Sequence, residues 1–198
     1  ENKEPDKKPD HFVGDFYVLY SEKLKENPEL EEETYEMLRK WENKEPEDIK
    51  LWKKMNSWAL EGFKETYNRY GVKMDKAYPE SKHYKKGKKI VEQGLEKGIF
   101  EKDEKGNIIV DLEEKGLGKK VVLRSDGTAI YITQDIALAK IRYKDFKMDK
   151  MIYVVGNEQI YHFKVLFEIF KLLEFPFAQD CYHLAYGMIA LPEGKMKS

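Results

Sequence analysis

Apolar positions in residues 1–70 recur with the spacing of amphipathic α-helices. The pattern predicts one helix over residues 11–27, a second that starts at Asn27-Pro28-Glu29, and a third from Ile49 to Tyr70 that Gly71 ends. Tryptophan, tyrosine and phenylalanine share the apolar face of the second and third helices. Because a period of 3.6 residues usually marks a buried face, we interpret this stripe as core packing rather than as a binding surface.

Residues 72–115 combine an extended segment, a basic helix and a hairpin. The helix is predicted over residues 84–97 and ends at Gly98, and two short β-prone runs flank a turn at residues 103–107. Lysines stand at positions 82, 85, 86, 88 and 89. They could contact phosphates, but charged helix surfaces are routine, so a solvated face is the favoured interpretation.

From residue 116 onward, strands and helices alternate. Strands are predicted over residues 120–124, 151–155 and 181–186, with an extended stretch at 129–132; a helix capped by Thr133 and another over 160–173 separate them. Such an order with right-handed crossovers predicts an α/β fold containing half of a doubly wound parallel sheet.

The centre of this region is the stretch from Met151 to His162. A buried strand runs into Gly156, and Asn157, Glu158 and Gln159 follow before the next helix starts. Open α/β sheets bind ligands at this kind of turn, where glycine permits close approach and helix N–H groups favour anionic oxygens. We therefore expect the functional site to lie at this turn.

Composition narrows the class of protein. The chain has 198 residues, and the hydrophobic fraction of 41% indicates a packed protein. Its net charge of -1 means that it lacks the overall excess of positive charge that would indicate nucleic-acid binding. Its one cysteine, Cys181, excludes an internal disulfide framework and suits a reducing compartment. No long apolar run or signal-like start is present, so the sequence predicts a cytoplasmic protein that does not enter a membrane.

Four segments carry a family resemblance: DHFVGDFYV at 10–18, SDGTAIYITQDIA at 125–137, GNEQIYHF at 156–163 and GKMKS at 194–198. Together, and in this order, they resemble the catalytic domain of arginyl-tRNA synthetases, which are class I aminoacyl-tRNA synthetases. The resemblance implies a Rossmann-type domain split by an insertion. Residues 1–115 would be the mainly helical inserted region with its connections, and residues 116–198 the second half of the nucleotide-binding domain.

The resemblance also implies site residues. Tyr131, Asp135 and Gln159 would bind arginine, and a carboxylate is the natural partner for the planar, permanently charged guanidinium group. ATP-binding roles would fall to the residues Gly156, Glu158, His162 and Met188.

The last residues resemble the mobile loop that stabilises the triphosphate in class I synthetases. Lys195, Lys197 and Ser198 would be catalytic there, with Lys197 standing where the usual motif has serine. The implied partners are arginine, ATP and tRNA(Arg), with Mg²⁺ held through the ATP phosphates rather than by a protein metal site.

Two family features are missing. The sequence has no HIGH-like motif, which the family would place before Glu1, and no anticodon-binding domain, expected after Ser198. We therefore expect an isolated fragment that is inactive alone. Three alternatives stay open: a class I synthetase for another amino acid, a non-catalytic RNA-binding module and a general nucleotide-binding domain.

Overall fold

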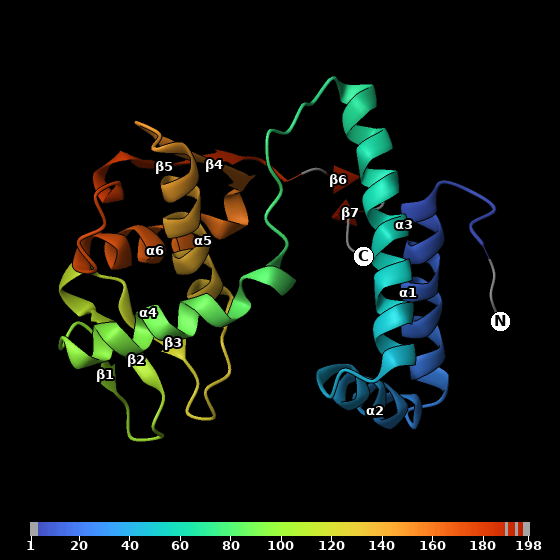
Figure 1. Cartoon of the computed structure of the whole chain (residues 1–198), viewed down its shortest axis with the longest axis horizontal. Coiled ribbons are helices and arrows are strands. Elements are labelled where there is room, and N and C mark those ends of the chain that lie inside the picture. The colour runs from blue at the N-terminus through green and yellow to red at the C-terminus, as the bar shows by residue number, and fades with distance from the viewer. Residues whose placement is uncertain (1–3, 189, 193, 196–198) are drawn as a thin grey trace. The chain divides into compact units, whose positions relative to one another are not determined.

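The computed structural model describes residues 4–188, 190–192 and 194–195, and the chain forms two compact units that divide after Asp75. The first unit holds three helices (Figure 1): α1 (Pro9–Glu26), α2 (Leu30–Glu42) and α3 (Pro46–Tyr70). The three helices predicted from the apolar spacing are confirmed.

Local sequence signals explain where these helices begin and end. Pro9 and Pro46 occupy the first helical positions of α1 and α3, where the missing N–H is not needed. Asp10 lies in the first turn of α1, where a carboxylate interacts favourably with the helix dipole. Gly71 ends α3 with φ 70°, a left-handed conformation that glycine adopts without steric cost.

A glycine allows α1 and α3 to pack closely. Gly62 of α3 is buried, and a Cβ atom there would lie 2.1 Å from a carboxylate oxygen of Asp10. Phe12 packs edge-on against Trp58, with ring centroids 5.6 Å apart. The predicted core stripe is only partly buried, however, because Phe63 is 48% and Tyr67 38% exposed. A bundle of this size has too little interior to cover every aromatic ring of a long helix.

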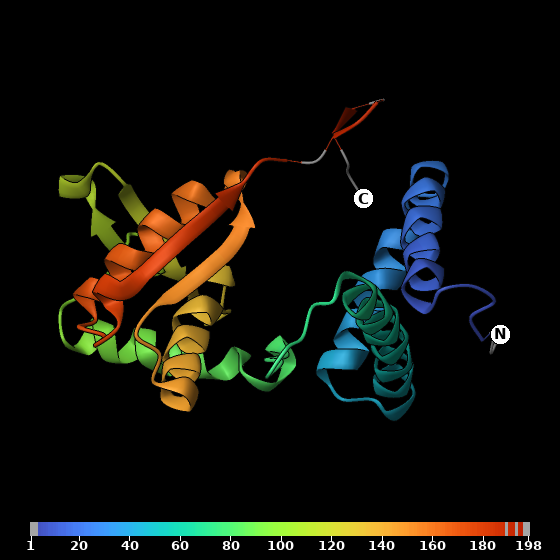
Figure 2. The ribbon, with the colours of Figure 1, turned by 90° about the horizontal axis from the view of Figure 1, so that it is seen from above.

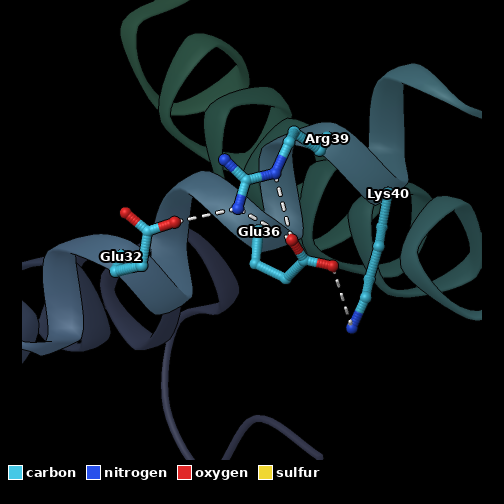
Figure 3. Close-up of polar contacts among 4 residues, drawn as sticks. All are labelled: Glu32, Glu36, Arg39 and Lys40. Carbon is cyan, nitrogen blue, oxygen red and sulfur yellow. Dashed lines mark hydrogen bonds and ion pairs between the residues drawn. The ribbon is translucent and has the colours of Figure 1, made fainter.

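The outer face of α2 carries a small ion-pair network (Figure 3). Arg39 reaches Glu32 at 2.9 Å and Glu36 at 2.8 Å, and Lys40 lies 4.0 Å from Glu36. The hydrogen bond from Arg39 lowers the pKa of the Glu36 carboxyl group. All four side chains are at least 41% exposed, so this network contributes little to stability.

The second unit, residues 76–197, mixes helices with two kinds of sheet. Its longer elements are α4 (Tyr84–Glu96), β2 (Ile108–Leu112), β3 (Gly118–Leu123), α5 (Tyr131–Phe146), β4 (Met151–Gly156), α6 (Ile160–Leu172) and β5 (Cys181–Tyr186). The short ones are η1 (Glu80–Lys82), β1 (Glu101–Lys102), η2 (Glu113–Lys115), η3 (Asn157–Gln159), η4 (Ala178–Asp180), β6 (Ala190–Leu191) and β7 (Gly194–Lys195).

The parallel sheet consists of β4 and β5. They pair in register from Met151 opposite Cys181 to Gly156 opposite Tyr186, and Figure 2 shows them side by side and running the same way. Helix α6 forms the connection between them, as parallel strands require. The predicted α/β fold with a parallel Rossmann-type sheet is confirmed.

One strand lies in a different sheet from the one expected. β3 pairs antiparallel with β2, and β1 completes a three-stranded sheet, so the prediction that residues 120–124 join the parallel sheet was wrong. The turn at η2, with Gly116 and Gly118 at positive φ, reverses the chain immediately before β3 and brings it back onto β2. The boundary expected at residue 115 stays a prediction, and β2 and β3 lie on its two sides.

Helix α5 begins earlier than the sequence pattern indicated. Residues 129–132 were expected to be extended, but the helix starts at Tyr131. Thr133, expected to precede the helix, lies in its first turn. Its hydroxyl accepts a hydrogen bond from the Ile130 N–H (3.1 Å) and donates one to the carbonyl of Val122. Because Thr133 caps the helix from inside its first turn, the helix start predicted from the sequence was wrong by a few residues.

The core of the second unit lies where α4, α5 and α6 meet the strands. Fully buried members of this core come from the antiparallel sheet and from all three helices, among them Val91, Val110, Val122, Ile136, Leu166, Ile169 and Phe170. This core fixes the starts of α5 and α6, which carry the predicted site residues Tyr131, Asp135 and His162.

Candidate functional site

The carboxyl ends of β4 and β5 form the base of the candidate site. Gly156 and Tyr186 are the last residues of the two strands and lie opposite each other in the sheet. In an open parallel sheet, this edge is where ligands bind. Gly156 leads through η3 directly into α6, so the N-terminal end of α6 lies next to the strand ends.

Gly156 and Met188, both predicted to bind ATP, come together at this edge. A Cβ atom added at Gly156 would lie 3.6 Å from the Met188 sulfur and 3.8 Å from the Tyr186 ring. These are ordinary van der Waals distances, and Gly156 has an unstrained φ of -57°. The glycine is therefore not needed for folding at this point.

The main polar contact of the site joins α5 to α6. The Nε2 atom of His162, in the first turn of α6, lies 2.8 Å from Oδ2 of Asp135 on α5. An ionised carboxylate only accepts hydrogen bonds, so the imidazole donates this one. The two side chains are 25% and 34% exposed, so the pair is shielded but reachable from solvent.

Tyr131 and Gln159 flank this pair. Tyr131 stands four residues before Asp135, on the same face of α5, and is 79% exposed. Gln159 stands three residues before His162, at the start of α6, and is exposed, as is Glu158. Among the described residues, Tyr131 and Gln159 make no hydrogen bond to each other. The structure thus joins Asp135 to His162 directly, while Tyr131 and Gln159 lie one turn away along the same two helices.

Sequence reasoning missed three residues beside the site. The Tyr161 hydroxyl donates to the Leu117 carbonyl at 2.6 Å, and the Lys120 ammonium lies 4.6 Å from the Tyr161 ring centroid. His183 donates from Nε2 to the Val155 carbonyl at 3.0 Å and stacks on Phe163 with ring centroids 4.3 Å apart. The period-two alternation of β5 could have placed His183 on the same face as Cys181.

Two titratable groups beneath the sheet are held neutral. Burial raises the pKa of Tyr153 far above its usual range, with a smaller contribution from Cys181. Burial also raises the pKa of the Cys181 thiol to about 11. Both groups therefore act as packing residues at neutral pH, and neither has the depressed pKa of a nucleophile.

The predicted catalytic loop is described only in part. Gly194 and Lys195 form β7, whose backbone pairs antiparallel with β6. Lys197 and Ser198 lie outside the described residues. Their catalytic assignment, like that of Lys195, stays a prediction.

Metal-ligand clusters and long apolar helices are both absent from the described part of the chain. It contains no group of three or more histidine, cysteine, aspartate or glutamate side chains that could hold a metal ion. None of its helices combines the length and apolar character needed to cross a membrane.

The chain matches a family model along its whole length. Residues 1–198 match the model described as tRNA synthetases class I (R), catalytic domain. The curated arginine–tRNA ligase of Treponema denticola is 57% identical over 193 residues, which cover 96% of this chain and 33% of that protein. The ligase of Parabacteroides distasonis is 50% identical over 209 residues, covering 97% and 35%. The chain thus spans about a third of the length of these relatives.

Solved structures share the fold. The arginyl-tRNA synthetase of Plasmodium falciparum superposes with a TM-score of 0.73 at 19% identity, covering 95% of this chain and 31% of that one. A putative arginyl tRNA synthetase from Campylobacter jejuni gives a TM-score of 0.64 at 20% identity, covering 78% and 34%.

Proposed function

Because the chain belongs to the family of class I arginyl-tRNA synthetase catalytic domains, we propose that it supplies the arginine-binding half of an ATP-dependent arginine–tRNA ligase. Its curated relatives are about three times as long, so the activity is that of a longer protein. The observation that carries the proposal is the Asp135–His162 pair, one turn after Tyr131 and beside the ends of β4 and β5.

The pair suits a guanidinium ligand. His162 holds one carboxylate oxygen of Asp135, and no other hydrogen bond to this carboxylate occurs among the described residues. The second oxygen is thus oriented and available to accept from a planar cation. Arginine, which stays charged and offers five donors, gains more from such an acceptor than lysine does. Tyr131 and Gln159 would complete the pocket as a ring surface and a neutral donor and acceptor.

ATP would bind at the neighbouring glycine edge. Gly156 and Met188 lie against each other there, Glu158 would accept from the ribose hydroxyls, and the loop lysines 195 and 197 would approach the triphosphate. Mg²⁺ would be held through the ATP phosphates.

The proposed reaction has two steps. The carboxylate of bound arginine attacks the α-phosphorus, a new C–O–P bond forms and pyrophosphate leaves with its electron pair. A terminal hydroxyl of tRNA(Arg) then attacks the adenylate carbonyl, loses its proton, and AMP leaves. Residues of this chain would orient the guanidinium end, so that the arginine carboxylate points toward the phosphate.

The test uses a full-length hybrid in which this chain replaces the matching third of the Treponema denticola ligase. Asp135→Asn keeps the shape but removes the charge, and we expect kcat/KM for arginine to fall about 10- to 100-fold, the scale of a hydrogen bond to a charged group, about 1.5–3 kcal/mol. The KM for ATP should change little. Asp149→Asn, at an exposed position away from the site, is the matched control.

A second arm separates the two roles open to His162. His162→Gln should raise the KM for arginine if the imidazole orients Asp135, and the KM for ATP if it contacts the nucleotide, as the family resemblance implies. An unchanged arginine KM in Asp135→Asn, or equal activity with lysine, would refute the arginine pocket.

A further inference from the structure

A histidine lies on the inner face of the parallel sheet. His183 of β5 is half-buried, whereas its neighbours Tyr182 and Leu184 point outward and are 59% and 48% exposed. It pairs in register with Tyr153 of β4, and α6 packs against this face of the two strands (Figure 1). An imidazole in such a position costs free energy unless its N–H group is hydrogen-bonded. Its role therefore follows from the partner of that N–H group.

The partner is a backbone carbonyl near the end of β4. Nε2 of His183 lies 3.0 Å from the carbonyl oxygen of Val155. A carbonyl oxygen only accepts hydrogen bonds, so the imidazole donates and its Nε2 atom carries the proton. This carbonyl belongs to the peptide group that joins Val155 to Gly156, and a peptide group is planar and rigid. The hydrogen bond therefore orients the N–H group of Gly156 together with the carbonyl of Val155.

Gly156 is a position where such a restraint matters. It is the last residue of β4, its partner Tyr186 is the last residue of β5, and η3 follows directly. Glycine also has a wider range of φ and ψ than any other residue. A peptide group at a strand end and next to a glycine can rotate unless another group holds it. His183 provides this hold from the neighbouring strand.

A phenylalanine keeps the imidazole in place. The ring of Phe163, in the first turn of α6, stacks on His183 with centroids 4.3 Å apart and an interplanar angle of 35°. Phe163 is itself only 7% exposed and lies 4.9 Å from the ring of Tyr153, so it cannot move away easily. With its Nε2 atom bonded to Val155 and its ring stacked on Phe163, His183 is placed to act through the backbone rather than by touching a ligand.

We propose that His183 is a positioning residue for nucleotide binding, which fixes the Val155–Gly156 peptide group so that the backbone of Gly156 offers ATP a preformed edge. The proposal rests on the proposed function for the identity of the ligand, and it concerns a residue outside the four motif segments. An edge that is already ordered does not have to be ordered when the ligand arrives, and this raises affinity. A purely structural histidine would instead stabilise the sheet and leave the affinity for ATP unchanged.

The test compares two substitutions in the full-length hybrid, each of which removes one of the two contacts. His183→Phe keeps a ring against Phe163 but removes the hydrogen-bond donor. His183→Gln removes the ring but keeps an N–H donor at a similar distance from the backbone. Tyr153→Phe is the matched control, because it removes a half-buried hydroxyl from the same face, where it donates to Sδ of Met151 at 2.9 Å, at the other end of β4. Thermal melting verifies that each variant is folded.

We expect His183→Phe to raise both the KM for ATP and the Kd for ATP from titration calorimetry about tenfold, the scale of one lost hydrogen bond, with the KM for arginine unchanged. His183→Gln should keep most of the affinity for ATP but melt at a lower temperature, because the contact with Phe163 is lost. Tyr153→Phe should keep the parent's values for ATP. A substitution that only destabilised the sheet would reduce the amount of active enzyme, and so lower kcat without changing the KM.

Two results would overturn the proposal. One is an unchanged affinity for ATP in His183→Phe, and the other is an equal loss of affinity in His183→Phe and His183→Gln, which would assign the effect to packing of the ring. If the parent hybrid binds ATP but does not activate arginine, the proposed function is refuted, while the calorimetric comparison still decides the role of His183. A parent hybrid that binds no ATP would overturn both.

Discussion

At the residue scale, a substitution at Gly156 can test for a ligand contact without disturbing the fold. Its φ of -57° suits any residue, and a Cβ atom would meet only Met188 and Tyr186 at ordinary distances. Gly156→Ala should therefore melt within about 2 °C of the parent, as surface substitutions without strain do. If ATP lies against this backbone, the added methyl group overpacks the site.

In the full-length hybrid, we expect Gly156→Ala to raise the KM for ATP by a factor of roughly 5 to 150, the equivalent of about 1–3 kcal/mol of overpacking. The KM for arginine serves as the internal control and should not move. A variant that melts normally and keeps the parent's ATP KM would remove ATP from this edge.

The buried thiol of Cys181 makes the stability of the folded chain depend on pH. Burial raises the pKa of its thiol from 9.0 to about 11, and its Sγ donates weakly to the Phe177 carbonyl at 3.3 Å. The unfolded chain therefore loses this proton first as the pH rises. The contribution of Cys181 to stability is complete below pH 9.0 and is lost as the pH rises toward 11.

Alkylation by iodoacetamide measures this shift, since the thiolate is the reactive form. At about pH 9 the folded chain should react at least about tenfold more slowly than the urea-unfolded chain, and the difference should shrink toward pH 11. Cys181→Ser, which does not titrate in this range, should lack the alkaline loss of stability. Equal rates for the folded and unfolded chains would contradict the raised pKa.

At the element scale, the close packing of α4 on α5 depends on Gly87. Alanine is the better helix former by about 1 kcal/mol, but its Cβ atom at this position would clash with the backbone of Thr133. Because the clash is with backbone, α4 has to move as a whole. We expect Gly87→Ala to lower the melting temperature of the second unit by about 3 °C or more, through about 1–3 kcal/mol of overpacking.

A helical glycine with free space provides the comparison. In α1, a Cβ atom added at Gly14 would have nothing within 4 Å, so Gly14→Ala should keep the stability of the parent or raise it by about 1 kcal/mol. If both substitutions stabilised the chain, the tight α4–α5 contact would be wrong.

At the scale of the whole molecule, the parallel sheet explains why this chain should be inactive alone. Parallel sheets are normally covered on both faces. In β4 and β5 the inner face packs on the core, while the outer face leaves apolar side chains exposed by 48% to 63%: Ile152, Val154, Tyr182, Leu184 and Tyr186. The relatives, which are about three times as long, have further chain that could cover this face.

We therefore expect the 198-residue chain to give no ATP–pyrophosphate exchange with arginine and tRNA(Arg), because under the proposed function it would supply only part of the substrate-binding surface. The full-length hybrid, assayed in parallel, supplies the positive control. Exchange by the isolated chain at a rate comparable to the hybrid would show that these residues suffice.

The sequence by itself determined the elements with strong local signals. The helices of the first unit, the hairpin at residues 103–107 and the strands β4 and β5 followed from apolar periodicity, proline and glycine positions and turn residues, all of which act within a few residues. It also determined the family, because four motifs occur in one order along the chain.

Only the tertiary structure decided which strands pair and which side chains meet. The pairing of β3 with β2 depends on how the chain folds back at Gly116, and the Asp135–His162 contact joins residues 27 positions apart. The exposure of Phe63 in a stripe expected to be buried likewise depends on how much surface the neighbouring helices cover. Local pattern sets the type of an element, whereas its partners depend on contacts between distant parts of the chain, which local pattern does not encode.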